Sequence, residues 1–180
     1  MRLFVAIELN REMKRQLLNI QEQLCRLGVR GNYTPPENFH LTLAFIGDYP
    51  KPDSVLEVLE SLCFEPFELH LSGLGSFGEL WWAGLEENEE LSNLVRQLRH
   101  KLAQAGIPFD KKKFLPHITL VRKPEYKQAP DFGALSLPQT AMRAERVSLM
   151  LSTHGKNGMI YTQLGSVHAQ TCRQDMGSRG

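Results

Sequence analysis

Two short segments of the sequence each hold a histidine and a threonine two residues apart among apolar residues. The first is HLTL at residues 40–43, and the second is HITL at residues 117–120. Chance predicts only about 0.2 His-x-Thr pairs in a chain with this content of the two residue types. Two occur, and leucine follows both, so the repetition indicates a shared purpose.

Alternation along a β-strand determines which side chains of the first motif point together. Residues i and i+2 of a strand lie on the same face of a sheet. We therefore expect His40 and Thr42 on one face, and Leu41, Leu43 and Phe45 on the other face, against helices. The second motif repeats this division. It is expected to present His117 and Thr119 together and to bury Ile118 and Leu120.

An imidazole and a hydroxyl on each of two strands suit acid–base chemistry best. A zinc site takes three or four His, Cys or carboxylate ligands, and threonine is a poor one, so no metal is expected. Nucleophilic catalysis would require an activated Ser or Cys, and no GxSxG signature occurs. An imidazole titrates near pH 6.5, so one histidine can be neutral while the other is protonated. The two hydroxyls could then stabilise developing negative charge on a phosphodiester.

The pattern along the first half of the chain predicts the elements that hold the first motif. Residues 2–9 are rich in β-forming types and predict a strand. Apolar residues at helical spacing over 11–27 predict a helix that Asn10 caps and Gly28 ends. A polar turn at 31–38 leads into the strand at 39–47. Asp53 is the expected N-cap of a helix over 53–63.

The second half follows the same order around the second motif. Strands are expected at 67–75 and 80–86, and a long helix that Asn88 caps and Gly106 ends precedes the strand at 116–122. Further strands are expected at 134–137, 144–152 and 159–167. Because a long helix precedes each His-x-Thr strand, the sequence predicts a diverged duplication, with two α+β lobes facing each other.

Length and composition favour one cytoplasmic domain. The 180 residues carry a formal net charge of +1, which gives no global field for nucleic acid or membrane. Only local clusters such as Lys111–Lys113 could attract nucleic acid, and these can equally be a solvated surface. The three cysteines lack CxxC spacing, so we expect them to be reduced. The domain is expected over residues 1–167, with a flexible tail at 168–180 and no membrane span.

The paired motifs, with FVAIEL near the N-terminus and FIG after the first motif, resemble the 2H phosphoesterase superfamily. The closest resemblance within it is to the RNA 2′,3′-cyclic phosphodiesterases, also called 2′-5′ RNA ligases. This resemblance implies a bilobal α+β fold, with two pseudo-symmetric lobes that are each an antiparallel sheet with helices on the outer face. The motifs would then face each other across a cleft between the sheets.

The resemblance also implies a reaction and roles for the motif residues. Water opens an RNA 2′,3′-cyclic phosphate end to a 2′-phosphomonoester, with His40 as proton donor and His117 as proton acceptor. Thr42 and Thr119 would bind the non-bridging oxygens. No cofactor is expected, the partner would be single-stranded or tRNA-like RNA, and the protein would be a monomer. Reversal of the same steps would give 2′-5′ ligation.

Two further substrate-binding residues come from the resemblance. Family members carry a basic residue just past the second motif, where Arg122 stands, although strand parity alone puts it on the face opposite His117. Phe4 lies where the family has an aromatic residue near the base, although the residue type and its place in an apolar strand favour a core residue. Of the remaining histidines, His70 is expected on a strand surface, and His154 in an exposed hairpin or at the mouth of the cleft.

Two alternatives to an RNA-end phosphodiesterase stay open on the sequence. One is a 2H phosphoesterase that acts on a small cyclic nucleotide or on a 2′-5′ oligonucleotide. The other is a non-catalytic module that binds RNA ends. Both motifs are intact, which argues against the second alternative.

Overall fold

A computed structural model describes residues 1–172 of the chain. It contains three α-helices and two short 3₁₀ helices: α1 (Arg11–Arg26), α2 (Pro52–Glu60), α3 (Glu89–Gln104), η1 (Pro36–Asn38) and η2 (Phe132–Ala134). Nine strands complete it: β1 (Arg2–Glu8), β2 (Arg30–Tyr33), β3 (His40–Asp48), β4 (Phe67–Phe77), β5 (Leu80–Leu85), β6 (His117–Glu125), β7 (Ala141–Ala144), β8 (Arg146–Gly155) and β9 (Gly158–His168).

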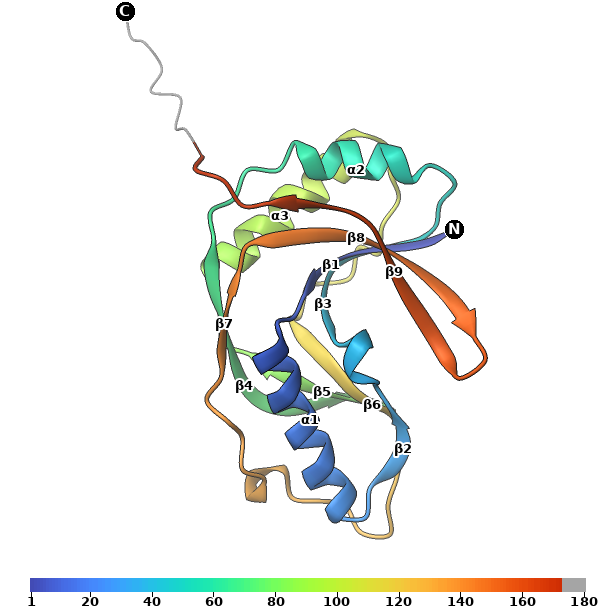
Figure 1. The fold of residues 1–180 in the computed structure, drawn as a ribbon, viewed down its shortest axis with the longest axis vertical. Coiled ribbons are helices and arrows are strands. Elements are labelled where there is room, and N and C mark those ends of the chain that lie inside the picture. The colour runs from blue at the N-terminus through green and yellow to red at the C-terminus, as the bar shows by residue number, and fades with distance from the viewer. Residues whose placement is uncertain (173–180) are drawn as a thin grey trace, which may run out of the picture.

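The strands form two antiparallel sheets, each of which contains one His-x-Thr motif. The first sheet has the order β3-β1-β8-β9, and the second has the order β2-β6-β5-β4-β7. Figure 1 shows the two sheets as separate lobes, with α2 and α3 on the first and α1 beside the second. The predicted bilobal α+β fold with two antiparallel sheets is therefore confirmed.

The helices connect the lobes in a reciprocal way. Helix α1 follows β1 of the first sheet but contacts β6 and β7 of the second, whereas α3 follows β5 of the second sheet and contacts β3 of the first. The units β1-α1-β3 and β5-α3-β6 thus repeat one order of elements. This exchange brings the two motif strands, β3 and β6, into contact with each other.

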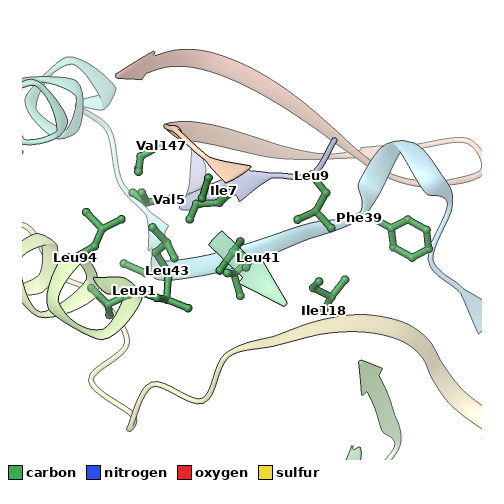
Figure 2. Packing of buried hydrophobic residues seen from close by; sticks show 14 of the residues in the cluster. Val5, Ile7, Leu9, Phe39, Leu41, Leu43, Leu91, Leu94, Ile118 and Val147 are labelled. Atoms are coloured by element: carbon green, nitrogen blue, oxygen red, sulfur yellow. The ribbon is translucent and has the colours of Figure 1, made fainter. Parts of the chain in front are cut away.

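One hydrophobic core supports both motif strands. Leu41 and Leu43 of β3 are fully buried, as is Ile118 of β6. Figure 2 shows Leu41 and Leu43 in the same cluster as Leu91 and Leu94 of α3. The leucines of the first motif thus anchor the strand while its polar residues stay free for the opposite face.

Side-chain caps begin the two long helices as predicted, but not the short one. Oδ1 of Asn10 accepts the N–H of Met13 at 2.8 Å, and Asn88 makes the equivalent bond in α3. The prediction that Asp53 caps α2 is wrong, because the helix begins one residue earlier, at Pro52. Proline is favoured in the first turn of a helix, and Asp53 follows it where a negative charge is stabilised.

Three predicted segments differ from the structure. Strand β2 lies where a turn was expected, since this short polar segment is held by pairing with β6. Residues 134–137, expected to be a strand, are not one: the N–H and C=O of Ser136 bond the side chain of Gln23 on α1 instead of a neighbouring strand. The predicted strand at 144–152 is split between β7 and β8.

The expectation that all three cysteines are reduced is wrong for two of them. Cys63 and Cys172 form a disulfide, and Cys25 is free and exposed. The pairing joins residues 109 positions apart, which spacing in the sequence cannot reveal.

The first residues of the expected tail at 168–180 are hydrogen-bonded to the rest of the domain. Strand β9 reaches His168, and the N–H groups of Ala169 and Gln170 bond the carbonyls of Glu145 and Phe64. The remainder of that predicted tail, 173–180, lies outside the described residues. Within residues 1–172, no helix combines the length and the apolar character that crossing a membrane requires.

Candidate active site

A cleft of about 350 Å³ lies between the two sheets and brings both motifs together. All six residues predicted from the sequence line it: Phe4, His40, Thr42, His117, Thr119 and Arg122. Nine others complete its wall: Arg2, Thr34, Asn38, Phe45, Leu80, Ser152, His154, Met159 and Tyr161. The cleft is therefore built by β1, β3, β8 and β9 of one lobe and by β5 and β6 of the other.

Each motif histidine is oriented by a backbone carbonyl two residues before it. Nδ1 of His40 lies 2.7 Å from the carbonyl oxygen of Asn38, and Nδ1 of His117 lies 2.6 Å from that of Leu115. A carbonyl only accepts, so Nδ1 carries a proton in both rings. This leaves Nε2 of each imidazole as the nitrogen that can gain or lose a proton.

Aromatic side chains surround both imidazoles in the same way. The rings of Phe4 and Tyr161 lie 4.8 and 5.1 Å from the ring of His40. Phe77 and Trp82 lie 5.1 and 6.0 Å from the ring of His117. These contacts restrict the orientation of each histidine and offer ring faces or edges beside the reacting groups.

The surroundings of His40 favour its neutral form. Burial lowers the pKa of this imidazole, and electrostatic repulsion from His117 and Arg122 lowers it further. The hydrogen bond to the Asn38 carbonyl and the carboxylate of Glu8 act in the opposite direction. An anion bound in the cleft would counter burial and repulsion and favour the protonated ring.

The lowered pKa of His40 makes the fold sensitive to acid. The pKa of His40 is near 6.5 in the unfolded chain, so the unfolded chain binds a proton more readily than the folded protein. The stability that neutral His40 gives the fold is therefore fully present above pH 6.5 and is lost as the pH falls below it. We expect the free energy of unfolding of the His40→Gln variant to fall less steeply with acidification than that of the wild type. Urea denaturation from pH 8 to pH 5 measures both curves; a parallel decline would contradict the expectation.

A bulge in β3 corrects the expected position of Phe45. Val5 of β1 pairs with Ala44 and Ala6 pairs with Thr42, so Leu43 is an extra residue. Leu43 and Ala44 are both buried, and the alternation of faces is reversed after them. Phe45, predicted on the helix side, therefore lies in the cleft.

A second bulge at the same place in the other motif brings Arg122 into the cleft. Trp81 pairs with Val121 and Trp82 with Thr119, which makes Leu120 the extra residue of β6. Strict alternation would have put Arg122 opposite His117. After the bulge, it lies on the cleft wall with the histidines.

Gln21 of α1 supports this second bulge. It is buried in the apolar stripe of the helix, and its Nε2 donates to the carbonyls of Thr34 and Leu120 at 2.8 and 2.9 Å. The N–H of Thr34 bonds the same Leu120 carbonyl. The sequence carries a signal for this role, because Gln21 is a polar residue within the apolar stripe of Leu17, Ile20 and Leu24.

Replacing Gln21 by leucine is expected to impair Arg122 indirectly. The change leaves the carbonyl of Thr34 without its side-chain donor, which costs about 1–3 kcal/mol of unfolding free energy. It also loosens the bulge, so the KM for a phosphodiester should rise more than kcat falls. Gln16→Leu, on the exposed face of α1, is the control. Unchanged kinetics and stability in Gln21→Leu would contradict this role.

Several cleft residues were missed because they come from distant parts of the chain. Met159 and Tyr161 belong to the β8–β9 hairpin, and Nδ2 of Asn38 donates to the carbonyl of Met159, which fixes the hairpin beside η1. His154 lies at the cleft as well as on the exposed hairpin. His70 is exposed on β4, as expected. No cluster of three or more His, Cys, Asp or Glu side chains suited to a metal exists among residues 1–172.

Comparison with known proteins identifies the family of this chain. A family model described as the 2′-5′ RNA ligase superfamily matches residues 28–156. The RNA 2′,3′-cyclic phosphodiesterase of Thermotoga maritima is 32% identical over 91% of this chain and 93% of its own length. The protein of the same name from Escherichia coli is 31% identical over 67% of this chain and 71% of its own.

Solved structures show the same architecture. The crystal structure of TT0787 of Thermus thermophilus has a TM-score of 0.76 and 30% identity, covering 93% of this chain and 97% of that one. Apo LigT of Escherichia coli has a TM-score of 0.78 over 94% of this chain and 98% of its own, at 24% identity.

The two lobes and paired His-x-Thr strands define a 2H phosphoesterase. The chain belongs to the 2′-5′ RNA ligase superfamily.

Proposed function

We propose that this protein hydrolyses RNA 2′,3′-cyclic phosphate ends to 2′-phosphomonoesters by two-histidine acid–base catalysis. The observation that carries the proposal is the pair of imidazoles in one cleft, each with Nδ1 engaged and Nε2 available. Relatives named RNA 2′,3′-cyclic phosphodiesterase, at up to 33% identity, support the substrate.

The proposed reaction needs one base and one acid. Nε2 of neutral His117 takes a proton from water as its oxygen attacks the phosphorus. The bond from phosphorus to the ribose 3′-oxygen breaks, and Nε2 of protonated His40 gives that oxygen its proton. The phosphate stays on the 2′-oxygen, and the two imidazoles have exchanged protonation states, which solvent then restores.

The environment of His40 bears directly on its role as the donor. Its pKa is lowered in the free protein, mainly by burial, so the ring favours the neutral form before substrate binds. The negative charge of a cyclic phosphate beside it favours protonation. Binding of the substrate thus favours the protonated form of His40, which a proton donor requires.

The other cleft residues suit binding of the phosphate and the base. The hydroxyls of Thr42 and Thr119 can donate to the two non-bridging oxygens, and the guanidinium of Arg122 adds positive charge there. Tyr161, half-buried beside His40, suits stacking with an unpaired base. Phe4 is only 3% exposed and packs against the rings of His40 and Tyr161, which it supports from within.

One assay separates the proposal from its alternatives. Turnover is measured on a 2′,3′-cyclic mononucleotide, on a 2′-5′ dinucleotide and on an oligonucleotide that ends in a cyclic phosphate. Opening of the oligonucleotide end supports the proposal, whereas turnover of only the first or second substrate supports a small-nucleotide or 2′-5′ enzyme. Binding without turnover would identify a non-catalytic module.

Metal independence and ligation are part of the same proposal. Among residues 1–172, no group of three His, Cys, Asp or Glu side chains is arranged to hold a metal ion. EDTA should therefore leave the rate unchanged, and strong inhibition would overturn the metal-independent mechanism. Ligation to a 5′-hydroxyl end would use the same two histidines in reverse. We also propose a monomer, which light scattering would test.

A further inference from the structure

A groove of about 550 Å³ adjoins the cleft on the far side of His117. Thr42, Phe45 and His117 line both cavities, so the two lie side by side. Nine other residues line the groove: Leu43, Ala44, Phe77, Arg99, Asp110, Lys112, Lys113, Phe114 and Leu115. The RNA attached to the 5′-oxygen of a terminal nucleoside bound in the cleft can therefore reach this groove.

The walls of the groove suit a nucleobase. Phe77 and Leu115 keep 42% and 49% of their surface exposed, so their apolar faces are open to a ligand. Together with Phe114, they form an apolar surface next to the ring of His117. Aromatic side chains of this kind stack on any base without reading its sequence.

The rim of the groove carries two lysines on a segment that is held in place. The N–H of Asp110 bonds the carbonyl of Phe45 at 2.8 Å, which ties this segment to the end of β3. Oδ1 of Asp110 accepts the N–H of Lys112, and Arg99 donates to the Lys112 carbonyl at 2.7 Å. None of the ion pairs found within residues 1–172 involves Lys112 or Lys113.

Arg99 adds a third positive charge below the lysines. Its guanidinium lies 5.9 and 5.8 Å from the ring centres of Phe109 and Phe114, and its Nε is buried without a hydrogen-bond partner among the described residues. Of the described residues that line this groove, Asp110 alone is acidic. The groove therefore carries a net positive charge, although the whole chain is close to neutral.

A second groove lies next to the first and differs from it in charge. It is larger, about 860 Å³, and shares Phe77, Lys113, Phe114 and Leu115 with the first. Glu87 and Glu89 line it and offset its Arg96 and Lys113. An RNA backbone leaving the cleft is therefore attracted to the groove of Lys112 and repelled by these glutamates.

We propose that the groove lined by Lys112, Lys113, Phe77 and Phe114 binds the penultimate nucleotide of the RNA, the one before the nucleotide that carries the cyclic phosphate. The lysines would contact its backbone phosphate, and the aromatic rings would stack on its base. This inference rests on the proposed function and extends it. It makes the protein selective for RNA ends over free cyclic nucleotides, because only an RNA end has a nucleotide to put there.

The test compares two substrates with the same terminal nucleoside, a 2′,3′-cyclic mononucleotide and a trinucleotide that ends in the same cyclic phosphate. In Lys112→Gln/Lys113→Gln, the ratio of kcat/KM for the trinucleotide to that for the mononucleotide should fall about tenfold. The salt dependence of log kcat/KM on the trinucleotide should weaken by about 0.7 for each phosphate that a lysine no longer neutralises. The control, Lys51→Gln/Lys127→Gln, removes the same charge elsewhere and should keep the wild-type ratio.

An unchanged ratio in the groove variant, or an equal fall in the control, would overturn the inference. Fluorescence anisotropy with a labelled trinucleotide ending in a 2′-phosphate tests the groove independently of catalysis. Weaker binding by the groove variant alone supports the inference, and equal binding by both variants contradicts it. If the wild type opens neither cyclic substrate, the proposed function fails, and the anisotropy result still decides the groove.

Discussion

Replacement of either His40 or His117 by alanine is expected to lower kcat on a cyclic-phosphate RNA end by ~10²–10⁴-fold, the range for a lost general acid or base. Each variant removes one of the two Nε2 atoms available in the cleft while the other histidine stays bonded to its own carbonyl. Single-turnover kinetics with saturating enzyme measures this effect on the chemical step. The two losses should not add in the double variant, because the histidines act as a unit.

Two other histidines provide matched controls for these variants. His70 on β4 and His100 on α3 are exposed and line none of the cavities described above. Their alanine variants should keep wild-type kcat and KM. Near-normal activity of His40→Ala or His117→Ala, with the fold intact by circular dichroism, would contradict the two-histidine mechanism.

Replacement of Thr42 or Thr119 by valine is expected to lower kcat by ~10²–10³-fold, as for a lost donor to a developing negative charge. Valine keeps the shape of the side chain but cannot donate a hydrogen bond to a non-bridging oxygen. Because the charge grows as the reaction proceeds, kcat should fall more than KM rises. Steady-state kinetics on the trinucleotide measures both constants.

The exposed Thr153 and Thr162 of the β8–β9 hairpin serve as controls for the threonine variants. Their valine variants should change kcat by less than about twofold, since neither lines the cleft. If Thr42→Val and Thr119→Val raised KM with kcat unchanged, the hydroxyls would bind the ground state and transition state equally, and the proposed stabilisation would be wrong.

The alternation of side chains within each motif was enough to predict which motif residues are buried and which face the cleft. Because side chains alternate along a strand, the sequence could assign Leu41 and Ile118 to the interior, and both are fully buried. The same rule failed for the residues after each motif, because the last leucine of each motif, Leu43 or Leu120, is the extra residue of a bulge. Nothing local in HLTLAF or HITLVR indicates a bulge, since Leu120 is held by Gln21 from another element.

The features that the sequence could not supply depend on contacts between distant segments. The Cys63–Cys172 disulfide and the β2–β6 pairing each join parts of the chain whose proximity only the fold establishes. Tyr161 enters the cleft on a hairpin that Asn38 holds. In contrast, the caps at Asn10 and Asn88 act within a few residues, and these local predictions were confirmed.

The most direct test of the central claim is the position of the phosphate after an RNA 2′,3′-cyclic end has been opened. The proposed mechanism, with His40 next to the departing 3′-oxygen, predicts a 2′-phosphomonoester alone. Phosphorus NMR or digestion with a nuclease that requires a free 2′-hydroxyl distinguishes the two products. A 3′-phosphomonoester, or an end that stays cyclic, would contradict the account.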